Sequence, residues 1–481
     1  MIRDLIGKVA DPDRALMRAM DALVDAAAVR HALDLGGARF RPGAPLKLLL
    51  AGYSGTRNTG ADVRVEEMIR QLRVVLGAEA VELSLLTIDP ALSAGYFRGV
   101  RQVLLPTLYP KFLFDECTKH HGVIACEGSM FKSKFANALS VMMAGALGLA
   151  AAEGKLSVGY GAEAGTMDDA LRDLVRRRCR DSLVLCRNEP SRGILEGMGI
   201  RTRGGTDTAW TFEPAPRARG AELLRRHGWD GVQRLLVVCP INPFWWPTKP
   251  DLLKAAAHRF GGQFRAEHYK SFYFHEWSEE AAANYEAYLS GLAAAVNAFV
   301  RERGAFVAIV GTEMLDRGAC EDLAKKVDVR APVLVSDQLD MYELVSVLRN
   351  ASLLVSSRYH AIVTSMPAGV PSLGVTMDER IANLLCDRGH PDLLLRVDEE
   401  GLADKLRSAL LRLEREAERV RRETLAFVPS QIRTMGLMGM DFADEVARVY
   451  PTFELPDVPR SFEHFIPELS PALQRLMGEY A

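Results

Sequence analysis

The feature that most constrains the fold is a regular alternation of short apolar runs with helical patterns. The run at residues 46–51 lies between Pro45 and Gly52, and apolar residues then recur with a helical period from Val65 to Leu76. Similar pairs follow along most of the chain. This alternation predicts an α/β protein in which helices cover both faces of parallel sheets. The expected strands are residues 46–51, 81–88, 103–105, 123–126, 156–160, 183–186, 235–239, 306–310, 333–335, 353–355 and 372–375.

These strands are too many for one small sheet, so we expect two doubly wound, Rossmann-like domains. The domain boundary is expected near residues 214–234. Residues 1–44 form an N-terminal helical segment, 45–215 the N-terminal α/β domain, and 216–425 the C-terminal α/β domain. Residues 426–481 form a helical tail that packs back on the domains.

An aromatic-rich insertion near residues 242–280 interrupts the alternation. Ten of the 34 residues from Phe244 to Trp277 are aromatic, including Trp245 and Trp246. One interpretation is an insertion that folds onto the domain surface. The other is an aromatic wall or lid at a ligand cleft, because amphipathic rings suit both sugar faces and interfaces.

The composition is that of an ordinary globular protein of 481 residues, with 60 basic and 62 acidic side chains. This balance gives no strong field for nucleic acid or an anionic membrane. The longest apolar stretch, residues 136–152, is shorter than a membrane span, and the N-terminus does not resemble a signal peptide. Seven cysteines without a Cys-x-x-Cys pair favour reduced thiols, a cytoplasmic protein and no zinc site.

A glycine-rich segment, Gly52 to Asp62, follows the first expected strand and opens a helix. Its glycines, Gly55 and Gly60 among them, allow tight turns and close approach to a ligand. Free N–H groups at a helix start attract anions, whereas Asn58 and Asp62 are equally suited to capping the helix. The spacing matches neither a Rossmann fingerprint nor a P-loop.

A second segment, Ser356-Ser357-Arg358-Tyr359-His360, follows an expected strand and precedes a helix. Such a junction lies at the carboxyl edge of a sheet, where open α/β sheets bind ligands. Arg358 offers a planar fork to phosphate or carboxylate, and His360 can transfer a proton near neutral pH.

Three more loops carry polar residues at or near strand ends. Arg187 is a candidate second anion ligand, with a surface salt bridge as its alternative. Asp207 is a candidate carboxylate in a glycine-rich loop, and Glu127 and Gly128 lie in the loop after the strand at residues 123–126. No convincing metal cluster is present, because the histidines lack ligand partners at suitable spacing.

Together these segments resemble the polysaccharide pyruvyl transferases. Residues 52–62 are similar to the family's Gly-x-x-Gly-x-x-Asn-x-Gly-Asp pattern, and Arg187 with Ser191 to its Arg-x-x-x-Ser segment. Residues 357–362, followed by Ala-Gly-Val-Pro at 368–371, look like its Arg-x-His segment and the turn after it. The matching blocks are spread over residues 46–390.

The resemblance implies a two-domain, glycosyltransferase-B-like enzyme that transfers pyruvate from phosphoenolpyruvate to sugar hydroxyls as a ketal. It then implies that Arg358 and Arg187 bind the donor's anions, that His360 is the acid–base, and that Asp207 orients the acceptor or assists its hydroxyl. The other expected substrate-binding residues are Gly55, Asn58, Gly60, Asp62, Glu127, Gly128 and Ser357. No cofactor is expected besides the donor.

The acceptor is a sugar or glycan whose identity the sequence leaves open. The aromatic insertion lies outside the family pattern, so we expect it to govern acceptor choice through Trp245, Trp246, His275 and Trp277. No nucleic-acid partner and no transmembrane segment are expected, and a homo-oligomer is left open.

Two alternative functions remain. A nucleotide-sugar glycosyltransferase can share this architecture, and Asp378 and Glu379 follow the Gly-Val-Pro turn, where such enzymes often hold the donor's ribose. A non-catalytic sugar-binding member is the other alternative. It is motivated by Ala61, which separates Gly60 from Asp62, and by Glu127, which stands where the family usually has glycine.

Overall fold

The computed structural model describes residues 12–264, 268–270 and 272–480. Its first sheet has seven parallel strands in the order β3-β2-β1-β4-β5-β6-β7. In chain order these are β1 (Leu46–Ser54), β2 (Val81–Thr87), β3 (Arg101–Leu104), β4 (Gly122–Ala125), β5 (Leu156–Ala162), β6 (Leu183–Cys186) and β7 (Arg201–Gly204). The order reverses between β1 and β4, as it does in Rossmann-like folds.

The second sheet has six parallel strands in the order β13-β12-β8-β14-β15-β16, and it reverses between β8 and β14. These strands are β8 (Leu235–Cys239), β12 (Phe306–Gly311), β13 (Val333–Val335), β14 (Leu353–Ser356), β15 (Ser372–Thr376) and β16 (Leu394–Arg396). The predicted fold class, two doubly wound domains with a helical C-terminal region, is therefore confirmed.

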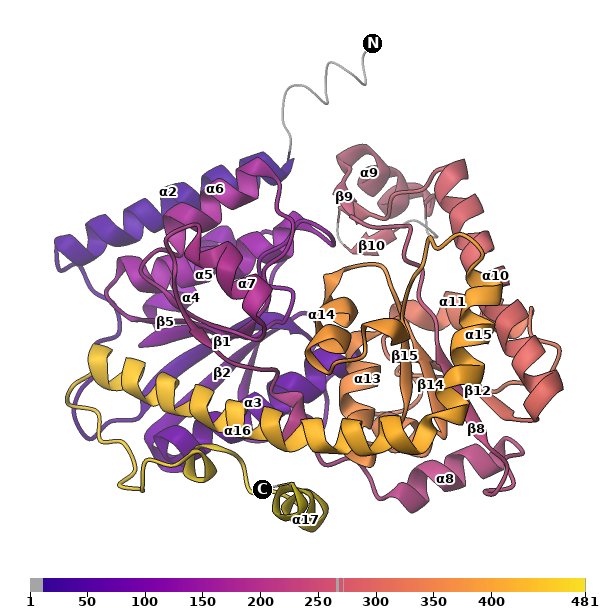
Figure 1. Cartoon of the computed structure of the whole chain (residues 1–481). Helices are drawn as coiled ribbons and strands as arrows, with labels where there is room; N and C mark the ends of the chain where they lie inside the picture. The colour runs from indigo at the N-terminus through magenta and orange to yellow at the C-terminus, as the bar shows by residue number, and fades with distance from the viewer. Residues whose placement is uncertain (1–11, 265–267, 271, 481) are drawn as a thin grey trace.

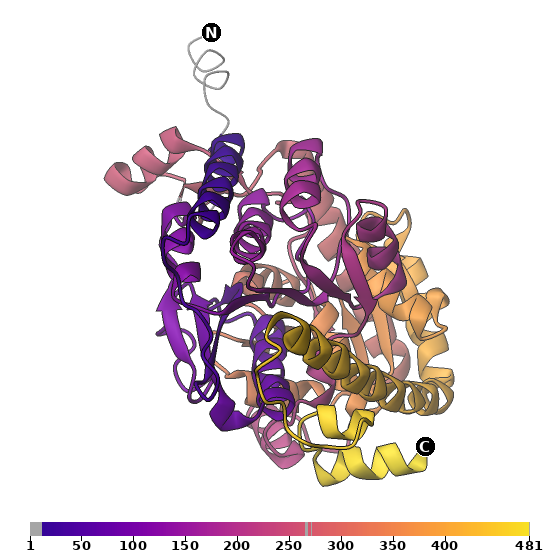
Figure 2. The ribbon, with the colours of Figure 1, turned by 90° about the vertical axis from the view of Figure 1, so that its left-hand side faces the viewer.

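Helices cover both faces of the first sheet, which forms the left-hand lobe of Figure 1. One face carries α2 (Pro12–Ala32), α4 (Pro110–Thr118), α5 (Asn137–Ala152), α6 (Asp169–Arg178) and α7 (Glu189–Glu196). The apolar stretch at residues 136–152 is therefore a buried helix, α5, which contacts β1, β4 and β5. The other face carries α3 (Thr59–Leu76) and part of α16. Figure 1 and Figure 2 both place α2 and α16 on opposite sides of this sheet.

Helices also cover both faces of the second sheet. They are α8 (Arg217–Arg226), α10 (Glu279–Arg303), α11 (Arg317–Ala324), α12 (Met341–Leu348), α13 (Tyr359–Ser365), α14 (Glu379–Asp387) and α15 (Leu402–Arg415). The short 3₁₀ turns among the described residues are Ala78–Ala80, Ala209–Thr211, Met314–Asp316, Met366–Ala368, Pro391–Leu393 and Phe462–Phe465.

The long helix α16 (Ala417–Val449) runs beneath both lobes in Figure 1. The expected division at 425/426 falls inside it, because Pro429 does not end the helix. Gln71 of α3 donates to the carbonyl oxygens of Met435 and Phe465 at 2.7 and 2.8 Å, which fixes the end of the chain to the first domain. The last helix is α17 (Pro471–Glu479). Within the described residues, no helix combines the length and apolarity needed to cross a membrane.

The aromatic insertion forms a small antiparallel sheet of β10 (His268–Lys270), β11 (Tyr273–Phe274) and β9 (Lys249–Pro250), with α9 (Leu252–Gly261) beside it. Several hydrogen bonds join it to the first domain. The N–H of Thr248 donates to the carbonyl of Phe135 at 2.8 Å, and the hydroxyl of Tyr269 donates to that of Tyr53 at 2.6 Å. The insertion therefore connects the two domains.

Candidate active site

The predicted motifs lie at the two points where strand order reverses. Residues 55–62 follow β1 and residues 126–129 follow β4, so they flank the reversal of the first sheet. Residues 357–360 follow β14, and β14 adjoins β8 at the reversal of the second sheet. Open α/β sheets bind ligands in the crevice outside such points.

The two carboxyl edges contact each other. The N–H of Thr59 donates to the carbonyl of Thr312 at 2.8 Å, and the hydroxyl of Ser336 donates to the carbonyl of Arg57 at 2.6 Å. Gly60 lies against the ring of His360, where a Cβ would come within 2.6 Å of Cγ. The glycine at position 60 thus allows the first turn of α3 to approach the imidazole.

His360 and Asp207 form the central pair between the domains. Nε2 of His360, at the start of α13, lies 3.2 Å from Oδ2 of Asp207, in the loop after β7. The Asp207 carboxylate is fully buried and the imidazole is 14% exposed. Burial by itself would raise the pKa of Asp207, but the charges of His360, Arg64 and Arg187 outweigh burial and hold that pKa well below its usual range. Asp207 therefore stays ionised and orients the imidazole.

A buried group of charges surrounds this pair on the first-domain side. Arg187 donates to Glu163 from Nε at 2.6 Å and to Asp207 from Nη1 at 3.1 Å. Nε of Arg64 lies 3.8 Å from Asp207, and Nζ of Lys132 lies 3.6 Å from Glu163. Lys132 also pairs with Glu379 of the second domain at 3.0 Å, so three cations face three carboxylates and the formal charges of the group balance.

The same group has donors without hydrogen-bond acceptors. Nε and Nη1 of Arg64 and Nζ of Lys132 are buried and make no hydrogen bond within the described structure. The loop after β4 makes room for the guanidinium groups, because a Cβ at Gly128 would lie 2.5 Å from Nη1 of Arg187. Glu127 uses its carboxylate to accept from the N–H of Gly128 at 2.8 Å. Buried guanidinium and ammonium groups with unsatisfied N–H donors suit an anionic ligand.

Arg358 has a different setting from the one the sequence suggested. Its Nε donates to Asp316 at 3.0 Å, and its Nη2 lies 2.8 Å from Glu313. Burial raises the pKa of both carboxyl groups despite the nearby guanidinium. The neighbouring residue, Ser357, shares a 2.8 Å hydrogen bond with Tyr288. Any anion that binds Arg358 must therefore share the guanidinium with these carboxyl groups.

The glycine-rich segment combines capping with a buried acid. The side chain of Asn58 accepts hydrogen bonds from the N–H groups of Gly60 and Ala61 at 3.1 and 3.2 Å, so it caps α3. Gly55 has a φ of 75°, a conformation that favours glycine. Burial raises the pKa of Asp62 well above its usual value, which favours the protonated acid, and Oδ1 has no hydrogen-bond partner in the described structure.

The four aromatic-insertion residues expected to choose the acceptor lie in different environments. Trp245 stacks on His275 with ring centroids 4.0 Å apart, and Trp246 meets Phe135 of the first domain edge-on at 5.4 Å. Burial lowers the pKa of His275 to about 4. Trp277 is 57% exposed. The structure therefore brings Trp245, Trp246 and His275 together and leaves Trp277 apart.

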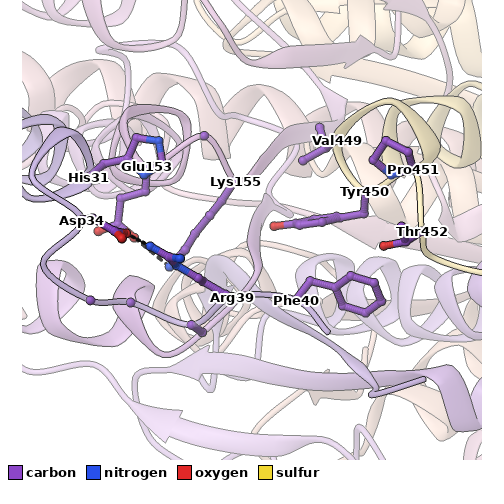
Figure 3. Close-up of a pocket in the computed structure, with 14 residues that line it drawn as sticks. His31, Asp34, Arg39, Phe40, Glu153, Lys155, Val449, Tyr450, Pro451 and Thr452 are labelled. Carbon is purple, nitrogen blue, oxygen red and sulfur yellow. Dashed lines mark ion pairs between the residues drawn. The ribbon is translucent and has the colours of Figure 1, made fainter. Parts of the chain in front are cut away.

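A separate pocket of about 400 Å³ lies between the end of α2, the end of α5 and the end of α16 (Figure 3). Its charged side holds the ion pairs Asp34–Arg39 and Glu153–Lys155, and Phe40 and Tyr450 lie on its apolar side. None of the sequence-predicted site residues lines it. Among the described residues, no group of three or more His, Cys, Asp or Glu side chains is arranged to hold a metal ion.

Sequence reasoning missed Arg64, Lys132 and Glu163. Arg64 lies in a helical pattern between Val63 and Val65, where an arginine usually marks a solvated face, yet its side chain is fully buried. Glu163 directly follows β5, so its position at a strand's carboxyl end was an available signal. No sequence signal pointed to Lys132, because it lies within the loop after β4 and not directly at the end of the strand.

The fold defines a class of protein, the two-domain proteins with a glycosyltransferase-B-like fold. A putative UDP-N-acetylglucosamine 2-epimerase from Listeria monocytogenes superposes with a TM-score of 0.51 at 12% identity, covering 83% of this chain and 98% of that one. Another UDP-N-acetylglucosamine 2-epimerase superposes with a TM-score of 0.50 at 11% identity, covering 87% and 100%. At this identity the likeness concerns the fold alone.

Within that class, residues 143–379 match the model of the polysaccharide pyruvyl transferase family. The match confirms the resemblance seen in the sequence and supports a transferase. It contains Arg187, Asp207, Arg358 and His360, whereas the glycine-rich segment and the loop after β4 precede it. No sequence among curated proteins matches the chain.

Proposed function

We propose that the protein transfers pyruvate from phosphoenolpyruvate to two hydroxyls of a sugar, with the reaction centred on His360. The observation that carries this proposal is the buried group of three cations, Arg64, Lys132 and Arg187, which includes N–H donors without hydrogen-bond acceptors and adjoins the His360–Asp207 pair. Phosphoenolpyruvate brings a phosphate and a carboxylate, and such anions need charge-assisted donors of this kind.

In the proposed reaction, two sugar oxygens bond to C2 of the donor, and the bond between C2 and the phosphate oxygen breaks. The two hydroxyl groups release two protons. One proton is added to the methylene carbon, and the other leaves with the phosphate. His360 gives the first proton as imidazolium and accepts one from an attacking hydroxyl as imidazole. Asp207 positions the ring and stabilises its charged form.

The arginines supply the electrostatic part of the proposal. Arg187 and Arg64 face the developing phosphate charge from the first domain, and Lys132 adds a third cation. Arg358 contributes from the second domain. When Glu313 or Asp316 is protonated, that carboxyl group no longer neutralises the guanidinium, and the positive charge of Arg358 then acts on the donor. The raised pKa values of those two acids favour this protonation.

The alternative of a nucleotide-sugar donor receives less support. Glu379 lies 3.0 Å from Lys132 and Asp378 lies 2.8 Å from Arg380, so both candidate ribose ligands are already in ion pairs. A thermal-shift comparison separates the two donors. At 100 times its Kd, a ligand adds about 2.7 kcal/mol of stability, so phosphoenolpyruvate should raise the melting temperature. Stabilisation by nucleotide sugars alone would contradict the proposal.

The variant His360→Ala tests the reaction itself. Loss of the acid–base should lower phosphate release from phosphoenolpyruvate by about 100- to 10,000-fold, while the melting temperature stays near that of the wild type because the ring is at the domain boundary. The measurement is phosphate release with an acceptor that gives wild-type turnover. Unchanged turnover would remove His360 from the reaction.

A further inference from the structure

An apolar pocket of about 140 Å³ lies at the carboxyl edge of the first sheet. Ile88 and Leu105, which follow β2 and β3, line one part of it, and Leu139 and Met142 of α5 line another. The aromatic insertion closes it with Phe272 and neighbouring tyrosines. It is distinct from the charged group around Asp207, and neither the proposed donor nor His360 uses it.

The tyrosines of this pocket use their hydroxyl groups elsewhere. Tyr109 donates to the carbonyl of Ala138 at 2.6 Å, and Tyr273 donates to Asp13 at 2.7 Å. The hydroxyl groups of Tyr53 and Tyr269 bond to each other at 2.6 Å. The rings therefore present carbon surface to the pocket, which suits an apolar occupant.

Tyr53 connects the pocket to the proposed active site. Its ring lines the pocket, and its hydroxyl interacts with Glu313 as well as with Tyr269. Glu313 in turn lies 2.8 Å from Nη2 of Arg358. Tyr53 therefore lies between a ligand in the pocket and the Arg358–Glu313 ion pair.

We propose that this pocket binds an apolar aglycone, an aryl or alkyl group attached to the acceptor sugar. The inference rests on the proposed function and specifies its acceptor. The donor is excluded as the occupant because its phosphate and carboxylate need charged partners, which this pocket does not offer among its described lining residues. The volume is close to that of a cavity of about 150 Å³ that holds benzene, so a six-carbon ring or a short alkyl segment fits.

The test compares binding of phenyl, hexyl and methyl β-glycosides, in a glucose and a galactose series, by ligand-observed NMR. Within each series the sugar is constant, so the ratio of affinities reports the aglycone. Phenyl or hexyl glycosides should bind at least about 10-fold more tightly than the methyl glycoside. A gain with phenyl alone identifies an aryl group, and a gain with hexyl alone identifies an alkyl chain.

Leu139→Trp fills the pocket and should abolish this gain. Phe272 is half-buried and forms part of the pocket wall. Phe272→Ala should therefore reduce the gain in affinity, and it replaces Leu139→Trp as the test if that variant fails to fold. Val232→Trp, at a position that is 91% exposed, is the matched control and should leave the gain unchanged. Equal binding of all three glycosides, or a gain that survives both pocket variants, would overturn the inference. Phosphate release is not measured, so failure of the donor proposal would leave this result interpretable.

Discussion

The substitution Gly60→Ala tests whether the position of His360 controls transfer. A Cβ at residue 60 would lie 2.6 Å from Cγ and 2.7 Å from Cβ of His360. Carbon atoms in contact are about 3.5 Å apart, so the imidazole or the start of α3 must move by about 1 Å. Residue 60 is in the first turn of α3 and has no positive φ. Alanine is therefore compatible with the helix and should favour it by up to about 1 kcal/mol.

A displacement of about 1 Å exceeds what the His360–Asp207 contact of 3.2 Å tolerates as a hydrogen bond. Misplacement of this size can cost about 100-fold in rate, so we expect kcat for phosphate release to fall by that order. Gly478→Ala in α17 is the matched control, because a Cβ there meets nothing within 4 Å. A Gly60→Ala enzyme with wild-type kcat would refute the argument that this contact positions the imidazole.

Three further substitutions test the charges. Arg358→Ala should raise the phosphoenolpyruvate concentration for half-maximal rate by about 10- to 150-fold, since a charge-assisted contact contributes about 1.5–3 kcal/mol; an unchanged value excludes Arg358 from donor binding. Lys132→Met keeps the side-chain volume and should weaken donor binding measured by calorimetry, whereas equal affinity would exclude Lys132. Native Asp62 keeps a proton that the unfolded chain releases above about pH 4, so this residue lowers stability as pH rises from there. Asp62→Asn should therefore gain stability over the wild type at pH 7 but not at pH 3 in urea denaturation, and an equal difference at both pH values would contradict the burial argument.

The strands of both sheets were predictable because most of them are buried on both faces. All eleven expected runs lie in or overlap strands of the two sheets. The sequence did not reveal β7 and β16, which are edge strands containing polar residues, such as Arg201 and Arg203 in β7. Nor did it reveal the two- and three-residue strands of the insertion. Short or edge strands lack the continuous apolar run that indicates a buried parallel strand.

The motifs of the candidate site were predictable for a related reason. A polar residue that follows a buried strand is placed at the carboxyl edge by the strand itself, as Arg187 and His360 are. Their partners were not predictable. Asp316 and Glu313, which pair with Arg358, follow β12, and Arg64 reaches Asp207 from α3. Which charges meet depends on how the two edges face each other, and no local pattern contains that information.

The proposed reaction uses residues that also hold the domains together. Asp207 and Lys132 come from the first domain, and they meet His360 and Glu379 of the second. The Asp207 and Lys132 side chains are at most 1% exposed. Under the proposed function, a donor therefore reaches them only if the domains separate, which breaks the Asp207–His360 and Lys132–Glu379 contacts. Its phosphate and carboxylate then take the place of Glu379 beside Lys132, so that donor binding itself restores the charge balance that allows the domains to close again.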